Sequence, residues 1–212
     1  MSSTDSDPGS TRPGGRTARN TAAVMRATLD ELGEQGYQRI SVDRIASRSG
    51  VHKATVYRRW GGVEGLLAQA LDWASGWHWE PVRTGSLYTD LISLNEEVAA
   101  GFTVAPEQRI SYATIAAAFD SDTAAAALRA YMADRHRRSS VLVAEAVARG
   151  EAPEETDTEE VVRASVAPIY HRLLVCREPV TARHIHRAAR ITADAAAAGA
   201  FLIEEHPDQN PT

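Results

Sequence analysis

The stretch that most constrains the fold of this chain is residues 40–60, ISVDRIASRSGVHKATVYRRW. Apolar residues recur at helical spacing on both sides of Gly50, a residue type that readily takes the positive φ needed in a tight turn. Ser41 can cap the first helix, and Asp43 suits its positive N-terminus. Cationic and hydroxyl side chains follow along the second helix. The pattern predicts a helix-turn-helix, which places a helix in a DNA major groove.

Charge is unevenly distributed along the chain. Between residues 12 and 60, ten Lys and Arg stand against four Asp and Glu, a net +6, whereas the whole chain carries −5 and the remainder therefore −11. A basic end can approach phosphates while an acidic remainder is repelled from them. An uneven but merely solvated surface would give the same count and stays open as the alternative.

The rest of the chain shows helical periodicity and no alternating strand pattern, which predicts an all-α protein of about nine helices. We expect a disordered tail over 1–15, a helix-turn-helix domain over 16–62, a helical ligand-binding and dimerisation domain over 63–204, and a flexible tail over 205–212. Thr181 is a predicted N-cap. The expected helices cover residues 17–35, 63–79, 87–100, 106–119, 123–149, 158–176 and 182–203, besides the two short ones.

Several classes of protein are disfavoured. The first ten residues lack an apolar segment, no run is long enough to span a membrane, and the single Cys176 permits no internal disulfide, so we expect a cytoplasmic protein. No nucleophile elbow, HExxH pair or phosphate-binding glycine loop is present, which weighs against an enzyme with a helical active site. His184 and His186 face different directions on a helix, so we expect no metal and no cofactor.

The second helix of residues 40–60 supplies most candidate DNA contacts. Lys53 can donate to guanine O6 and N7, and Ala54 can pack on a thymine methyl. Hydroxyl and guanidinium groups suit phosphate oxygens. An ordinary helical hairpin with a solvated polar face is the alternative. The predicted DNA-binding residues are Ser41, Arg44, His52, Lys53, Ala54, Thr55, Tyr57, Arg58 and Arg59.

A combination of short motifs resembles the N-terminal domain of the TetR/AcrR family of bacterial transcriptional regulators over residues 17–72. The motifs are Gly36-Tyr37, Ile40-Ser-Val, Ile45-Ala46, Gly50-Val51, Thr55-Val-Tyr-Arg-Arg-Trp60 and Glu64-Gly-Leu-Leu67. The segment Pro168-Ile-Tyr-His-Arg-Leu-Leu-Val175, followed by Glu178-Pro179, is similar to a C-terminal domain of one subset. Many members carry Pro-Ser-Lys-Glu where this chain has Gly61-Gly62-Val63-Glu64, so the lysine that commonly meets phosphate is absent.

The resemblance implies a homodimer paired through the last two helices, roughly 158–204, and a recognition helix over residues 52–59. It also implies a repressor that a small organic effector releases from a pseudo-palindromic operator. The effector would act by changing the spacing of the two DNA-binding domains of the dimer. A ligand-independent regulator or an activator of the same fold is the alternative. Small residues at 195–200 would allow the close helix approach of a dimer, although they equally suit an intramolecular contact.

The ligand pocket is harder to locate in the sequence. Aromatic rings with a few polar groups suit an amphipathic organic ligand, although any one ring could simply fill the core. We expect the basic run at 134–138 to be a solvated helix face. The candidate ligand-binding residues are Trp77, Phe102, Tyr112, Phe119, Tyr131, Tyr170 and His171.

Overall fold

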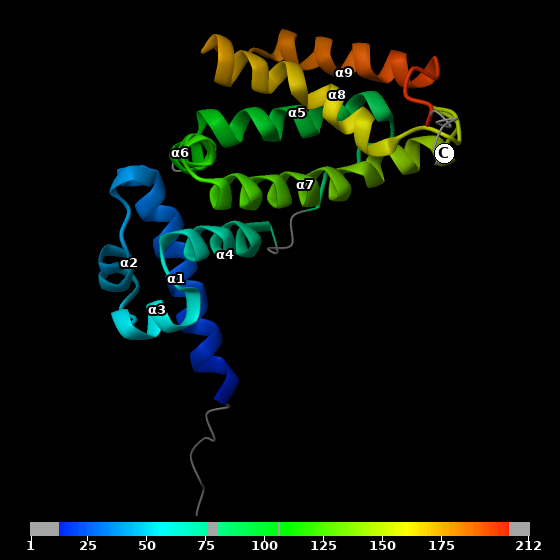
Figure 1. The fold of residues 1–212 in the computed structure, drawn as a ribbon. Coiled ribbons are helices and arrows are strands. Elements are labelled where there is room, and N and C mark those ends of the chain that lie inside the picture. The colour runs from blue at the N-terminus through cyan, green and yellow to red at the C-terminus, as the bar shows by residue number, and fades with distance from the viewer. Residues whose placement is uncertain (1–12, 76–79, 106, 204–212) are drawn as a thin grey trace, which may run out of the picture.

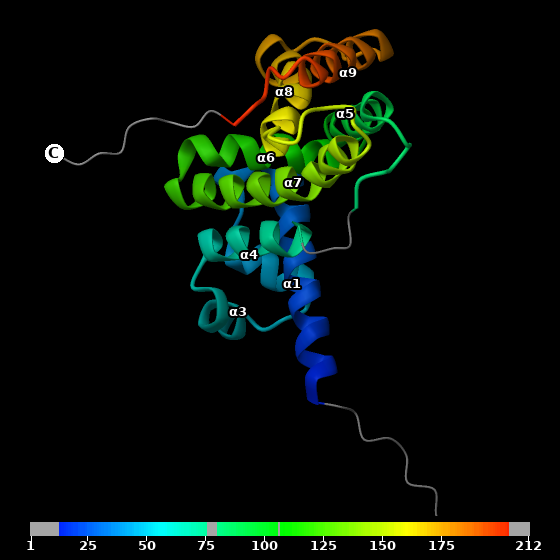
Figure 2. The ribbon, with the colours of Figure 1, turned by 90° about the vertical axis from the view of Figure 1, so that its right-hand side faces the viewer.

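The computed structural model describes residues 13–75, 80–105 and 107–203, and within them it contains nine α-helices, which confirms the all-α prediction. The N-terminal helices form one unit, here called the head, and the others form the body above it (Figures 1 and 2). The head contains α1 (Pro13–Gln35), α2 (Val42–Ser49), α3 (Lys53–Trp60) and α4 (Val63–Ser75), with a 3-10 turn at Tyr37–Arg39. The body contains α5 (Leu87–Thr103), α6 (Glu107–Asp120), α7 (Asp122–Ala148), α8 (Thr158–Tyr170), a π-helical segment (His171–Cys176) and α9 (Ala182–Ala197).

Local signals explain how α2 and α3 begin. The hydroxyl of Ser41 accepts a hydrogen bond from the backbone N–H of Arg44 at 3.3 Å, so Ser41 caps α2 as expected. Gly50 ends α2 with φ of 69°, the left-handed conformation that glycine adopts without strain. His52 precedes α3 rather than opening it, because its Nδ1 accepts from the N–H of Ala54 and makes it the cap.

The junction between α3 and α4 depends on a close backbone approach. A methyl group on Gly65 would lie 2.0 Å from the carbonyl oxygen of Trp60, so only glycine fits this first turn of α4. The buried leucines that follow, Leu66 and Leu67, belong to the same core as Val56 of α3. The division expected at residues 62 and 63 therefore separates helices that share one core.

Side chains of the head and of the body pack directly against each other. Gly33 of α1 lies against α6, where an added methyl group would stand 3.0 Å from Cγ1 of Ile110. The side-chain amide of Gln38 donates to Asp120 at 2.8 Å. Ala117 of α6 and Ala124 of α7 are buried in the same cluster as the head leucines. A displacement of α6 or α7 would therefore shift α1 and α4 through these direct contacts.

Helices α8 and α9 form the layer of the body farthest from the head (Figure 1). Thr181 is the N-cap of α9, as predicted, and its backbone N–H donates to Nδ1 of His184 at 3.2 Å. Helix α9 ends at Ala197, earlier than the expected residue 203, because Gly199 takes φ of 77°. At the other end of the chain, α1 begins at Pro13, inside the tail expected over 1–15. Residues 1–12 of the first expected tail and all of the second, 205–212, lie outside the described residues.

Among the segments that the structure describes, none is both long enough and apolar enough to cross a bilayer.

Candidate nucleic-acid interface and internal cavity

The structure places the predicted DNA contacts of α3 on an open surface of the head. Val56 points into the core, whereas His52, Lys53, Ala54, Tyr57, Arg58 and Arg59 are exposed and Thr55 is half-buried. Ser41, the N-cap of α2, is half-buried, and Arg44 of α2 is exposed. The exposed residues of α3 give this surface three cationic groups. The phenol of Tyr57 and the hydroxyl of Thr55 can bond to phosphate oxygens.

Lys53 forms an ion pair with a residue of α2. Its Nζ lies 2.6 Å from Oδ1 of Asp43 and 5.7 Å from the centre of the Tyr57 ring. The hydrogen bond to Asp43 raises the pKa of Lys53, so the amine stays charged. An exposed ion pair of this kind contributes little stability. Lys53 can therefore leave Asp43 for a base or a phosphate at small cost.

Arg44 has a structural partner in addition to its predicted DNA role. Its Nε donates to Oε2 of Glu31 at 2.6 Å, and Nε of Arg48 donates to the other oxygen at 2.8 Å. Burial raises the pKa of Glu31, but the hydrogen bonds and charges of the two arginines outweigh it and leave that pKa lowered. The sequence pattern did not reveal this cluster, which fixes α2 against α1.

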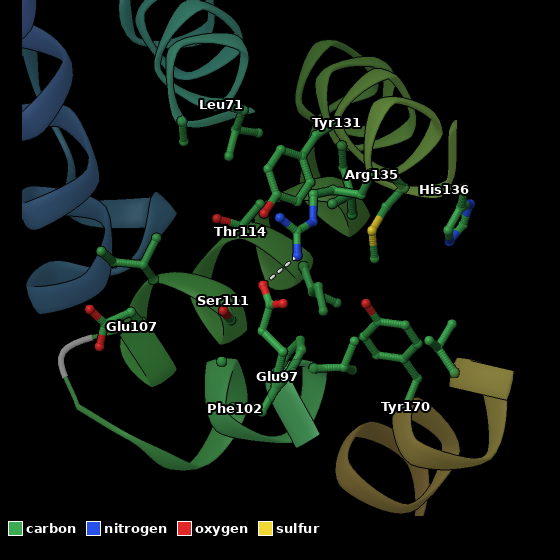
Figure 3. A pocket seen from close by; sticks show the side chains of 18 of the residues that line it. Leu71, Glu97, Phe102, Glu107, Ser111, Thr114, Tyr131, Arg135, His136 and Tyr170 are labelled. Atoms are coloured by element: carbon green, nitrogen blue, oxygen red, sulfur yellow. Dashed lines mark hydrogen bonds and ion pairs between the residues drawn. The ribbon is translucent and has the colours of Figure 1, made fainter. Parts of the chain in front are cut away.

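A cavity of about 360 Å³ lies where the body meets the head (Figure 3). Most of its wall comes from apolar side chains of α5, α6, α7 and α8. Leu29 of α1 and Leu71 and Ala74 of α4 complete it. The cavity therefore has the size of a small organic ligand and is bordered by two helices of the head.

Polar groups converge on one part of this cavity. Nη2 of Arg135 donates to Oε1 of Glu97 at 2.8 Å, and the two side chains meet near Tyr131 and Thr114 (Figure 3). Oγ1 of Thr114 is buried and, within the described part of the chain, has no hydrogen-bond partner. The phenol of Tyr170 points toward the same space, and burial raises its pKa to about 12. It is therefore protonated and can donate a hydrogen bond.

The structure brings together three of the seven predicted ligand-binding residues. Phe102, Tyr131 and Tyr170 line the cavity. Trp77 lies outside the described residues. Tyr112, Phe119 and His171 do not line the cavity. Helical spacing in the sequence did not show which face of each helix points inward. Tyr112 packs edge-on against Phe102 with ring centres 5.4 Å apart, Phe119 is 87% exposed, and His171 is exposed beside the thiol of Cys176 at 3.5 Å.

Most polar residues of the wall, among them Glu97, Thr114 and Arg135, were not anticipated from the sequence. Glu97 and Thr114 lie in helical segments without a distinguishing motif. Arg135 belongs to the run over 134–138 that reads as a solvated face, yet it is the member of that run whose guanidinium reaches the cavity. Among the described residues, no group of three or more His, Cys, Asp or Glu is arranged to hold a metal ion.

A short helix with exposed cations, held by a preceding capped helix and a tight turn, defines a helix-turn-helix DNA-binding protein. Residues 24–70 match the family model described as bacterial regulatory proteins of the tetR family, and residues 81–192 match a tetracyclin repressor-like C-terminal domain. The chain belongs to the TetR family and is a DNA-binding transcriptional regulator, not an enzyme.

Individual relatives agree with this assignment. A DNA-binding transcriptional repressor, TetR, of Mycobacteroides abscessus is 30% identical over 161 residues, which cover 74% of this chain and 84% of the relative. The uncharacterised regulator YdeS of Bacillus subtilis is 24% identical over 77% of this chain and 82% of its own length. The crystal structure of the TetR-family regulator SCO0332 superimposes with a TM-score of 0.66 at 25% identity, over 83% of this chain and 97% of that one.

Proposed function

We propose that this chain is a cytoplasmic, homodimeric repressor that binds a pseudo-palindromic operator through α3 and leaves it when a small organic molecule fills the body cavity. The observation that carries the proposal is the composition of the cavity wall. Leu29 of α1 and Leu71 of α4 line the cavity and also pack with the core of the head. A ligand in this space touches the same helices that position α3.

The path from cavity to DNA is short. Leu71 follows the first turn of α4, where Gly65 lies against the carbonyl of Trp60 at the end of α3. This contact is between backbone atoms, so a shift of α4 is transmitted to α3 and is not absorbed by a side-chain rotation. In a two-fold dimer, such a shift changes the separation of two recognition helices that must match half-sites about 34–36 Å apart.

The outer layer of the body supports the dimer. Ile191 of α9 is 62% exposed, and Val175 of the π-helical segment that follows α8 is 71% exposed. Helices α8 and α9 lie on the side of the molecule away from the head (Figure 1). Small residues such as Ala167 of α8 and Ala197 of α9 are also exposed and permit close approach. A second copy related by a two-fold axis would cover this surface with the same residues.

Selection of bound duplexes from a random library, followed by titration at several salt concentrations, tests the DNA-binding part of the proposal. Lys53→Ala should reduce discrimination between the selected site and a mutated site by roughly 5- to 150-fold, because it removes a base contact. Arg58→Ala should lower affinity for both sites alike and flatten the salt slope by about 0.9. Wild-type binding by both variants would show that the recognition helix has been misplaced.

The effector part has a separate test. A compound that binds the chain should lower its affinity for the selected site. If bound compounds leave the operator affinity unchanged, the protein is the ligand-independent regulator of the same fold. If they raise it, release is replaced by recruitment.

A further inference from the structure

We infer that the ligand of this cavity is an uncharged aromatic molecule carrying a hydrogen-bonding oxygen that reaches Thr114. The inference rests on the proposed ligand-responsive function and names the class of molecule that the cavity accepts. Three features of the wall carry it: its balance of charge, one buried hydroxyl without a partner, and its aromatic rings.

The charges of the inner wall already cancel. Glu97 and Arg135 form an ion pair across the cavity from α5 to α7. His136 adds no charge at neutral pH, because burial, aided by the positive charge of Arg163, lowers its pKa. Glu107 is exposed, so its carboxylate is solvated at the rim. A charged ligand would therefore give up its hydration for a wall whose described residues offer no unpaired opposite charge inside.

Thr114 marks the place of the polar atom. Its side chain belongs to the cavity wall, the residue is only 6% exposed, and Oγ1 has no hydrogen-bond partner among the residues that the structure describes. A buried hydroxyl in this condition costs free energy until a partner is supplied. Figure 3 shows Thr114 on the same side of the cavity as Tyr131 and Arg135. A ligand oxygen placed there would satisfy the hydroxyl.

The remaining wall suits a flat ring system. Phe102 packs edge-on against Tyr170 with ring centres 5.7 Å apart, and Tyr131 faces them from α7. Aromatic pairs of this kind leave ring faces and edges for offset or edge-to-face contact with a further ring. Leu29, Leu71 and Ile115 supply aliphatic surface around them.

A matched set of naphthalenes tests the inference on the full chain by isothermal titration. The probes are naphthalene, 2-acetylnaphthalene, 2-naphthoate and 2-naphthyltrimethylammonium, which share a ring system and differ in acceptor and charge. We expect 2-acetylnaphthalene to bind tightest, about five- to tenfold better than naphthalene. Thr114→Val, which keeps the shape, should abolish that advantage. Thr103→Val is the control, since its hydroxyl bonds to the carbonyl of Ala99 outside the cavity wall.

Each outcome decides the matter. Tightest binding by the carboxylate or the ammonium overturns the inference, as does an undiminished acetyl preference in Thr114→Val or the failure of all four probes to bind. Operator binding is measured on the same samples without ligand. Intact DNA binding with the wrong ligand preference refutes only the ligand class, whereas a bound acetyl compound that leaves operator affinity unchanged refutes only the release mechanism.

Discussion

Replacing Gly65 by alanine is the most direct test of the α3–α4 junction. The new methyl group would lie 2.0 Å from the Trp60 carbonyl oxygen and 3.2 Å from its carbon, and both are backbone atoms. No rotamer change can relieve this contact, so α4 must move away from α3. Without such a contact, replacing a glycine inside a helix by alanine typically raises the free energy of unfolding by about 1 kcal/mol.

The magnitude follows from these opposing effects. Forcing a methyl group into occupied space costs about 1–3 kcal/mol in well-packed proteins, and a 2.0 Å backbone contact belongs at the upper end. After the gain in helix propensity, we expect Gly65→Ala to unfold about 2 kcal/mol more easily, a loss of roughly 4–8 °C in Tm for a chain of this length. Operator affinity should fall as well, because the orientation of α3 changes.

Urea unfolding followed by circular dichroism, at a fixed protein concentration, measures the first effect. Gly62→Ala is the matched control, since its added methyl group would meet no atom within 4 Å and its φ is not positive. It should be neutral or slightly stabilising. If Gly65→Ala were as stable as Gly62→Ala, the junction would be looser than the structure indicates and the proposed path from cavity to α3 would lose its rigid link.

Two further predictions concern the head and the outer layer. Glu31→Gln should destabilise the chain by about 1.5–3 kcal/mol, because it weakens charged hydrogen bonds to Arg44 and Arg48 at a side chain that is nearly fully buried. The pKa of Glu31 in the folded state is lowered from its usual value of 4.5, so this stability is present above pH 4.5 and is lost as the pH falls below it. The urea midpoints of the wild type and Glu31→Gln should therefore converge in acid, and a pH series in which they stayed apart would contradict this. If the proposed dimer pairs through α9, Ile191→Glu should give a monomer in sedimentation velocity, because it places a carboxylate in that surface. Val82→Glu, at a similarly exposed residue between α4 and α5, should leave the proposed dimer intact.

The head could be predicted closely because its signals are local. A cap at Ser41 and a glycine turn at Gly50 are each determined by a few neighbouring residues, and both are found where expected. The close contact at Gly65 could not be foreseen, because it depends on the angle between α3 and α4. Similarly, the salt bridges of Glu31 join residues thirteen and seventeen positions away across two helices.

The cavity was less predictable because it is a product of packing. Thr114 and Phe119 are both on α6, five residues apart, which places them on different faces of the helix. One is buried at the cavity and the other is 87% exposed, and the aromatic residue would have been the usual choice for a ligand contact. Within 134–138, Arg135 turns inward while Arg137 stays at the surface, a distinction that composition does not make.

The shared core of head and body bears on how such regulators can be recombined. Because Ala117 and Ala124 of the body are buried among head leucines, and Leu29 of the head lines the cavity, the proposed DNA and ligand specificities would not be carried by interchangeable modules. A chimera cut between α4 and α5 would bring together two mismatched surfaces at this core. Exchange of sensing between relatives would therefore require transplanting the inward faces of α6 and α7 together with α1 and α4, and these faces should diversify as one unit during evolution.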